Sequence, residues 1–299
     1  MPTTSKTILI TGATAGIGRH AALHLSSRGH HVIATGRNQA ILDALRAEAL
    51  TAVPAGARFD VLRLDVNDAA SIREAVASVD ALTEGRGLDA LVNNAGYGIA
   101  GAVEEISDAD LRAQFDTNVF GVMAVTRAFL PRMRARGAGR IVNVSSIGGR
   151  FIFPMMGAYN ASKFALEGLS DALRLELRPA GIEVALIEPG PIRSEFSDRM
   201  FDTVPKSLDG SHYAEAYARA GALKARSDAQ AAGPLVVSKA IERAIVSRRP
   251  SARYVVPRGL ALVLALMTLL PTRWTDALLR RLVGLTGGVS SAKRLAQAT

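Results

Sequence analysis

The chain has 299 residues, of which 48% are hydrophobic and 21% are charged. This composition allows a large buried core and argues against global disorder. Because the chain has no cysteine, disulfides, zinc–thiolate sites and thiol nucleophiles are excluded, and we expect no metal site. The formal charge of +9 suits an anionic partner such as nucleic acid, lipid or cofactor. The positive residues are scattered and aromatic residues make up only 5%, so we do not expect nucleic-acid binding.

The chain alternates short apolar runs with amphipathic helical patterns. Strands are predicted at Thr7–Ile10, 31–35, 58–64, 88–92, 140–144, 182–187 and Arg253–Val256. Helices are predicted at 17–28, 38–49 (capped by Asn38), 69–82, 111–136, 158–178 and 234–248. This order predicts an α/β fold: a doubly wound parallel sheet of the Rossmann-like, three-layer αβα kind, in a single domain with a helical C-terminal extension. Ligands on such sheets bind beyond the carboxyl ends of the strands.

Neither end of the chain predicts a secreted or membrane-spanning protein. No long apolar core with a cleavage site precedes Thr7–Ile10, so a cytoplasmic location is the default expectation. The apolar run GLALVLALMTLL at 259–270 has twelve residues, whereas a spanning helix needs about 20. We favour a buried core helix there. The alternative is a hydrophobic lid or an interfacial anchor giving weak membrane-surface contact through 259–283, because four arginines flank or follow the run: Arg258, Arg273, Arg280 and Arg281.

The segment 188–233 differs from the regular pattern around it. It holds prolines, glycines and only broken helical periodicity, which predicts an irregular lid or binding loop. We therefore expect residues 1–256 to form the α/β domain, including this loop. Residues 257–299 are expected to form a helical extension packed on or near the ligand site.

A glycine-rich turn directly follows the first predicted strand. The segment TGATAGIG, at 11–18, places Gly12, Gly16 and Gly18 before a predicted helix. Glycines let a pyrophosphate approach the backbone, and the start of a helix offers unpaired N–H groups. Glycines also serve ordinary turns, but the strand–turn–helix context favours a dinucleotide site.

The end of the second predicted strand indicates which dinucleotide would bind. An NAD enzyme places an acid there, on the ribose 2′-hydroxyl. This chain has Thr35, Gly36, Arg37 and Asn38 instead. An arginine suits a 2′-phosphate, so Arg37 favours NADP(H) over NAD(H). The alternative is that Arg37 is an ordinary solvated charge.

Three motifs follow one another along the chain: TGATAGIG, NNAG at 93–96, and YNASK from Tyr159 to Lys163. In this order and spacing they resemble the short-chain dehydrogenase/reductase superfamily, from about residue 7 to residue 194. The resemblance implies an oxidoreductase that moves a hydride between nicotinamide and a carbonyl or alcohol carbon.

The resemblance also implies a catalytic group of four residues. Tyr159 and Lys163 lie four apart on a predicted helix and so share one face, although such a pair alone is more often a solvated face. Ser146 precedes Tyr159 by thirteen residues, which is the family's spacing, and is preferred to Ser145. Asn118, in the run DTNVFG, resembles the fourth residue. As alternatives, either serine would only form a turn, and Asn118 would only bond to helix backbone.

The chemistry suggests a role for each of the four residues. Hydride attack on a carbonyl builds negative charge on oxygen, so Ser146 would polarise that oxygen and Tyr159 would donate the proton, or accept it in oxidation. The Lys163 ammonium is expected to lower the pKa of Tyr159 and, as the resemblance implies, to bond the nicotinamide ribose. Asn118 would hold a water that restores the proton.

The remaining cofactor contacts are also implied by the resemblance. In chain order they are Gly12, Thr14, Gly16, Ile17, Gly18, Arg37, Asp65, Val66, Asn93, Ala95, Gly96, Pro189, Gly190, Ile192 and Ser194. Asp65 resembles the residue at the adenine edge. Asn93 and Gly96 resemble the stretch beside the adenosine ribose. Ser194 stands in the segment over the nicotinamide, where the family often has threonine, and it keeps the hydroxyl.

The C-terminal part resembles the branch related to hydroxysteroid and retinol dehydrogenases, because RYVVPRG at 253–259 is followed by the apolar run. This implies a lipophilic ketone, aldehyde or alcohol that is steroid-, retinoid- or lipid-like. Four side chains would either line its pocket or pack in the core: Phe151, Phe153, Met155 and Met156.

The family commonly forms homo-oligomers, so a dimer or tetramer is expected. The alternative function, an NADPH-binding regulator or membrane-peripheral scaffold without turnover, is disfavoured because all four catalytic residues are present.

Overall fold

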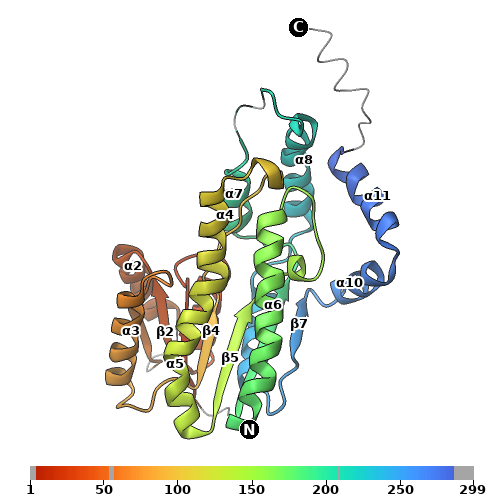
Figure 1. Cartoon of the computed structure of the whole chain (residues 1–299). Coiled ribbons are helices and arrows are strands. Elements are labelled where there is room, and N and C mark those ends of the chain that lie inside the picture. The colour runs from red at the N-terminus through yellow and green to blue at the C-terminus, as the bar shows by residue number, and fades with distance from the viewer. Residues whose placement is uncertain (1–4, 54–56, 206, 208, 286–299) are drawn as a thin grey trace, which may run out of the picture.

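The computed structural model describes residues 5–53, 57–205, 207 and 209–285. One parallel sheet has the strand order β3-β2-β1-β4-β5-β6-β7 (Figure 1). Its strands are β1 (Thr7–Ile10), β2 (His31–Gly36), β3 (Phe59–Arg63), β4 (Ala90–Asn93), β5 (Gly139–Val144), β6 (Ile182–Pro189) and β7 (Arg253–Val256). The predicted doubly wound α/β fold is confirmed. The order reverses between β1 and β4, which opens a crevice at their carboxyl ends.

Helices cover both faces of the sheet and complete three layers. One face carries α1 (Gly16–Ser27), α2 (Gln39–Ala52) and α9 (Leu235–Val246). The other carries α3 (Ala69–Leu82), α5 (Val122–Arg136) and α6 (Gly157–Leu177). Side chains of one strand alternate between the two cores, because successive residues point to opposite faces: Ile8 and Ile10 enter the first core and Leu9 the second.

Local capping explains several helix boundaries. The Asn38 side chain accepts a hydrogen bond from the Ile41 amide at 3.2 Å, which confirms the predicted N-cap of α2. The predicted helical region 111–136 is divided into α4 (Asp108–Phe115), a π-helical turn η2 (Asp116–Gly121) and α5. π-Helical turns are frequent at functional sites, and η2 contains Asn118. Short 3₁₀ turns complete the chain at η1 (Val103–Glu105), η3 (Ile147–Gly149) and η4 (Arg178–Ala180).

The segment 188–233 is not irregular, so that prediction is wrong. It contains α7 (Glu195–Phe201) and the long α8 (Ala214–Gln230). Helix α8 is rich in alanine, a good helix former. Its buried residues are only Ala216 and Tyr217, so the sequence lacks the apolar stripe by which a helix is usually predicted. Figure 1 shows both helices beyond the carboxyl ends of the strands. The Tyr217 hydroxyl ties α8 down by donating to Glu105 Oε2 at 2.9 Å.

The favoured buried core helix at 259–270 is also wrong. Helices α10 (Leu260–Leu269) and α11 (Thr272–Val283) lie beside the β7 edge of the sheet (Figure 1). Within α10 only Leu264 is buried, whereas Leu262 is 68% and Leu269 is 81% exposed. Because the sheet faces are already covered by other helices, α10 has only one side to bury. No helix in the described part of the chain has the length and apolarity needed to span a membrane. Residues 286–299 of the predicted extension lie outside the described residues.

Candidate active site

A cavity of about 1840 Å³ opens at the carboxyl ends of the strands. Its wall runs from the glycine turn after β1, past the ends of β4 and β5, to α6, α7, α8, α10 and α11. A pocket for one small ligand typically measures about 300–1,000 Å³. The cavity therefore has room for a dinucleotide together with a second molecule.

The glycine turn requires its glycines. Gly12 and Gly16 line the cavity and have φ of +63° and +52°, in the left-handed region. A Cβ at Gly18 would lie 2.3 Å from the Gly12 carbonyl oxygen. Gly18 does not line the cavity, so its contribution is the close packing of α1 against the turn.

The start of α1 is open to an anion. Its N-cap is Ala15, which has no capping side chain, and the first turn holds no acidic residue. Ala15, Gly16 and Ile17 line the cavity, as does Thr14. Unpaired N–H groups and the positive end of the helix dipole therefore face the space that a pyrophosphate would occupy.

Asn94 braces this turn, although the sequence analysis selected its neighbour. Its Nδ2 donates to the carbonyl oxygens of Thr11 and Gly12, each at 3.0 Å. Asn93 instead points into the core, donating to Thr126 and Asn143 at 2.9 Å, and it does not line the cavity. The sequence could have indicated this role, because the motif NNAG holds a second asparagine, Asn94, beside the one that was selected.

The adenosine end of the cavity carries a free positive charge. Arg37, Asp65 and Val66 all line it. Arg37 is exposed and makes no ion pair with any residue that the structure describes. Residues 35–38 hold no carboxylate, so the side chain at the end of β2 that faces this part of the cavity is a cation.

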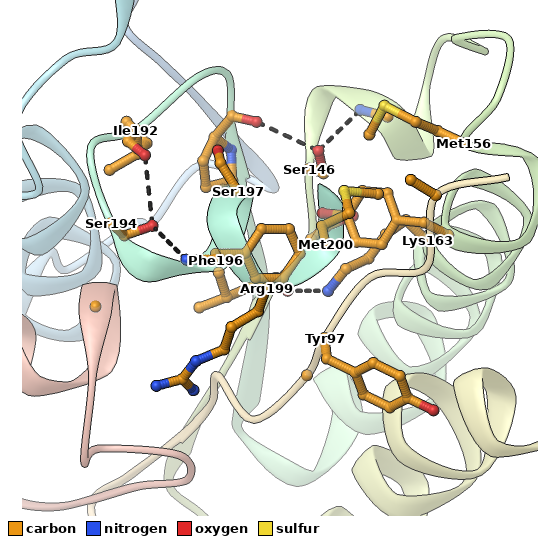
Figure 2. A pocket seen from close by; sticks show the side chains of 18 of the residues that line it. Tyr97, Ser146, Met156, Lys163, Ile192, Ser194, Phe196, Ser197, Arg199 and Met200 are labelled. Carbon is orange, nitrogen blue, oxygen red and sulfur yellow. Dashed lines mark hydrogen bonds between the residues drawn. The ribbon is translucent and has the colours of Figure 1, made fainter. Parts of the chain in front are cut away.

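Ser146, Tyr159 and Lys163 come together on one wall of the cavity. Ser146 follows β5; its Oγ accepts from the Gly148 amide at 3.0 Å and donates to the Pro189 carbonyl at 3.4 Å (Figure 2). Lys163 Nζ donates to the Val144 carbonyl at 2.9 Å and lies 5.8 Å from the Tyr159 ring centroid. Tyr159 and Lys163 are each only 6% exposed, so they do not form a solvated helix face.

Burial controls the protonation of this pair. It raises the pKa of Tyr159 to about 12, against a hydrogen bond with Ser146 that lowers it. Burial also lowers the pKa of Lys163 to about 8, against the charge of Glu167, which raises it. The expected lowering of the Tyr159 pKa by Lys163 is not found in the protein alone, where desolvation is the largest influence and the Ser146 hydrogen bond is the one that opposes it. Tyr159 holds its proton at neutral pH.

Asn118 lies in η2 and is fully engaged by the protein. Its Oδ1 accepts from the Tyr97 amide at 3.1 Å, and its Nδ2 donates to the Tyr97 carbonyl and Ser162 Oγ at 2.9 and 3.0 Å. Asn118 does not line the cavity, and both amide hydrogens are used. Its side chain therefore ties the loop after β4 to α6, and its expected role in holding a water stays a prediction.

The segment after β6 closes the cavity over the catalytic wall. Pro189, Gly190, Ile192 and Ser194 all line it, as do Ala95 and Gly96 across the crevice. Ser194 Oγ donates to the Ile192 carbonyl and accepts from the Phe196 amide, both at 3.4 Å (Figure 2), so it caps α7.

Apolar side chains dominate the rest of the cavity. The four residues left open between pocket and core all line it: Phe151, Phe153, Met155 and Met156. The Phe196 ring centroid is 5.6 Å from that of Tyr159, and Met200 packs against Tyr159. The C-terminal helices add Leu260, Val263, Leu264, Met267, Leu279, Leu282 and Val283. The cavity therefore offers apolar contact beside Tyr159, from Phe196 and Met200, and along α10 and α11.

The order of these elements matches known proteins. Residues 6–204 match the sequence profile of the short chain dehydrogenase family. The chain is 37% identical over 276 residues to an uncharacterised oxidoreductase of Escherichia coli, YbbO, covering 92% of this chain and 94% of the relative. The chain belongs to the short-chain dehydrogenase family. The resemblance stated from the motifs is confirmed, and this short-chain dehydrogenase is an oxidoreductase acting on CH–OH groups.

Two further relatives have named activities. A 3-ketodihydrosphingosine reductase of Bacteroides thetaiotaomicron is 35% identical over 82% of this dehydrogenase and 86% of the relative. Human 17-beta-hydroxysteroid dehydrogenase type 1 is 38% identical over 68% of this dehydrogenase and 61% of the relative.

Solved structures of the family include complexes with both dinucleotides. An enzyme of Burkholderia phymatum in complex with NAD has a TM-score of 0.76 at 27% identity, over 90% of this dehydrogenase and 94% of that chain. A serine dehydrogenase complexed with NADP+ has a TM-score of 0.70 at 31% identity, over 84% and 94%. The family therefore binds NAD or NADP in this fold.

Proposed function

We propose that this short-chain dehydrogenase uses NADP(H) to interconvert a ketone or aldehyde and an alcohol on a lipophilic substrate. One observation supports this most: a single cavity connects Arg37 and the glycine turn to Ser146, Tyr159 and Lys163, and continues between apolar helices. The proposal has three parts, which are the cofactor, the chemistry and the substrate.

The residues at one end of the cavity fit a dinucleotide. The uncapped start of α1 and the turn at Gly12 and Gly16 suit its pyrophosphate. Arg37, in the place of an acid, supports a preference for NADP(H). When bound, the dinucleotide supplies or accepts the hydride.

The protein's own residues supply the polar part of the reaction. The Ser146 hydroxyl, held by the Gly148 amide and the Pro189 carbonyl, is placed to hydrogen-bond the substrate oxygen. The Tyr159 hydroxyl, whose pKa burial raises from 10 to about 12 and so farther above neutral pH, is in the protonated form that carbonyl reduction needs. Lys163, still largely charged near pH 7, stabilises negative charge as it develops on that oxygen.

The apolar lining supports a lipophilic substrate. Two relatives are named for acting on a ketodihydrosphingosine and on a hydroxysteroid. In this chain the walls from Phe151 to Met156 and from α10 and α11 offer comparable apolar contact. Each large apolar group buried there would add about 1.5–3 kcal/mol to binding.

We propose further that the enzyme acts in the cytoplasm, with α10 and α11 touching an anionic membrane surface. Their outer sides expose Leu262, Leu266, Leu269 and Trp274, and arginines 258, 273, 280 and 281 are exposed around them. Flotation with vesicles containing anionic phospholipid tests this contact; no association at low salt would contradict it.

The same proposal includes a homo-oligomer. Exposed apolar side chains on η2 and α6, namely Phe120, Phe164 and Leu175, offer a face for a second copy. Sedimentation of the purified chain as a monomer at micromolar concentration would contradict this part alone.

A substrate panel tests the proposed activity. NADPH and NADH oxidation are measured with long-chain, sterol-like and retinoid-like carbonyls and with small polar ketones. We expect turnover with lipophilic carbonyls and a preference for NADPH. Turnover confined to small polar ketones would contradict the proposed substrate class. NADPH binding without turnover of any carbonyl would instead favour the alternative function, an NADPH-binding regulator.

A further inference from the structure

A cluster of buried charges lies directly behind the catalytic wall. Glu167 is 5% exposed and Glu188 is 0% exposed. Arg253 Nε donates a hydrogen bond to Glu167 Oε2 at 3.1 Å and forms an ion pair with Glu188 Oε1 at 3.0 Å. Its Nη2 also reaches Asp171 Oδ2 at 2.6 Å. Burying two carboxylates is costly unless cations pair with them. Arg253 and Asp171 are partly exposed, and none of the four residues lines the cavity.

The cluster adjoins Lys163 through helix α6 and through Gly149. Glu167 follows Lys163 by four residues on α6, so the two lie on one face of the helix. A Cβ at Gly149 would lie 2.9 Å from Ser145 Oγ, 3.0 Å from Glu167 Cγ and 3.1 Å from the Lys163 carbonyl oxygen. The absence of a side chain at Gly149 therefore allows Ser145, Glu167 and the Lys163 backbone to pack closely around it. Glu188 precedes Pro189, whose carbonyl accepts from Ser146.

We propose that Glu167, fixed by Arg253, is a positioning residue that keeps the Lys163 ammonium charged while Lys163 is held on the Val144 carbonyl. This inference rests on the proposed function, in which Lys163 acts as a cation beside Tyr159. It adds a carboxylate that touches neither substrate nor cofactor and acts only through the lysine.

The surroundings of Lys163 make Glu167 the decisive charge. From its own helix Lys163 faces the neutral Tyr159 and the carboxylate of Glu167; from η2 it faces the neutral Asn118 amide beyond Gly96. Glu167 is the charged group that raises the pKa of Lys163 against the effect of burial. Without that carboxylate only desolvation remains, and Lys163 loses its proton at lower pH.

The rest of the cluster determines the charge of Glu167. Burial raises the pKa of Glu167, and the neighbouring Glu188 raises it further, whereas Ser145 and Arg253 lower it. Arg150, after η3, pairs with Glu188 at 3.4 Å and offsets that second carboxylate. Arg253 therefore maintains the charge that Glu167 applies to Lys163.

The pH dependence of carbonyl reduction tests the inference. Because the pKa of Tyr159 is about 12 and that of Lys163 about 8, we assign the fall of kcat/KM on the alkaline side to Lys163. In Glu167→Gln this fall should move to lower pH by about one unit, and Glu167→Asp should restore part of the shift. Asp171→Asn is the matched control, because it removes a carboxylate from the same arginine one turn farther from Lys163. In Asp171→Asn, kcat/KM should fall at the same alkaline pH as in the wild type.

A second measurement does not depend on turnover. The rate of acetylation of Lys163 by acetic anhydride, followed by peptide mass spectrometry against pH, gives the midpoint of its deprotonation in the free enzyme. We expect a lower midpoint in Glu167→Gln and a smaller change in the same direction in Ser145→Ala, which serves if the first variant does not fold. An unmoved midpoint in both variants, or an equal shift in Asp171→Asn, overturns the inference. A moved midpoint in an enzyme that turns over no carbonyl would instead overturn the proposed function and leave the Glu167–Lys163 coupling in place.

Discussion

The two halves of the cavity are built in different ways. The cofactor half is formed by strand ends and a glycine turn, in which hydrogen bonds between side chain and backbone link Asn94 to Thr11 and Gly12. The substrate half is formed by α7, α8, α10 and α11, which lie outside the sheet layers and expose many apolar side chains. Under the proposed function, the sheet would fix the reaction, whereas the added helices would select the substrate and could vary without altering the chemistry.

Ser146→Ala should have the largest effect among the variants that sharpen this comparison. It removes the hydroxyl expected to bond the substrate oxygen, so kcat should fall about 10²–10³-fold while NADPH binding stays near that of the wild type. Steady-state kinetics and NADPH titration measure both. Ser145→Ala is the control, since Ser145 is buried beside Ser146; both variants are assayed at pH 6, well below the alkaline fall that Ser145→Ala is expected to shift. An equal loss in kcat for both serines would break the assignment.

Arg37→Ala should change the cofactor half alone. Loss of a charged contact to the 2′-phosphate is worth about 1.5–3 kcal/mol, so the preference for NADPH over NADH should fall at least about tenfold. The KM values for both dinucleotides, with one fixed carbonyl, give this ratio. Arg19→Ala is a suitable control, because Arg19 instead pairs with Glu48. An unchanged ratio would show Arg37 to be an ordinary surface charge.

Met267→Ser should change the substrate half alone. Met267 lines the cavity from α10, so KM for a lipophilic carbonyl should rise about tenfold with no change in the dissociation constant of NADPH. Leu269→Ser lies on the same helix but does not line the cavity and should leave KM unchanged in detergent-free solution. A parallel change in both constants would contradict the division into halves.

Lys163→Met should give the smallest effect, on stability. The pKa of Lys163 is lowered from 10.5 to about 8 in the folded protein, so below pH 8 the fold bears the cost of a buried ammonium. Between pH 8 and 10.5 the unfolded chain binds more protons, and wild-type stability rises with pH. After loss of the bond to Val144, the variant should be about 1 kcal/mol more stable at pH 7, an advantage that fades by pH 10.5. Denaturant unfolding of both proteins from pH 7 to pH 10.5 measures this advantage. A difference in the free energy of unfolding that does not change with pH would contradict the prediction.

The sequence predicts the sheet and the meeting of Ser146, Tyr159 and Lys163 at one cavity, for physical reasons. β-Branched runs and glycine turns encode strands and their crevice locally, and the N-cap at Asn38 was predictable from one side chain. The motif spacing was sufficient to bring Ser146, Tyr159 and Lys163 together.

What the sequence did not predict depends on packing between distant segments. Helix α8 has strong helix propensity but no apolar stripe, so it was missed. The run at 259–270 is apolar on all sides, so its sequence alone fits a buried helix. It lies beside the β7 edge because other helices already cover both faces of the sheet. The orientations of Asn93 and Asn94, and the burial that raises the pKa of Tyr159, likewise follow from neighbours far along the chain.

The Tyr159 hydroxyl is the group on which both halves converge, and Tyr159→Phe tests the account most directly. The phenylalanine keeps the apolar packing against Phe196 and Met200 and removes only the proton donor. NADPH binding and carbonyl turnover are measured on one preparation. We predict a loss of turnover of about 10³-fold with the dissociation constant of NADPH within about twofold of wild type. Turnover that persists in this variant, with the cofactor bound normally, would contradict the account.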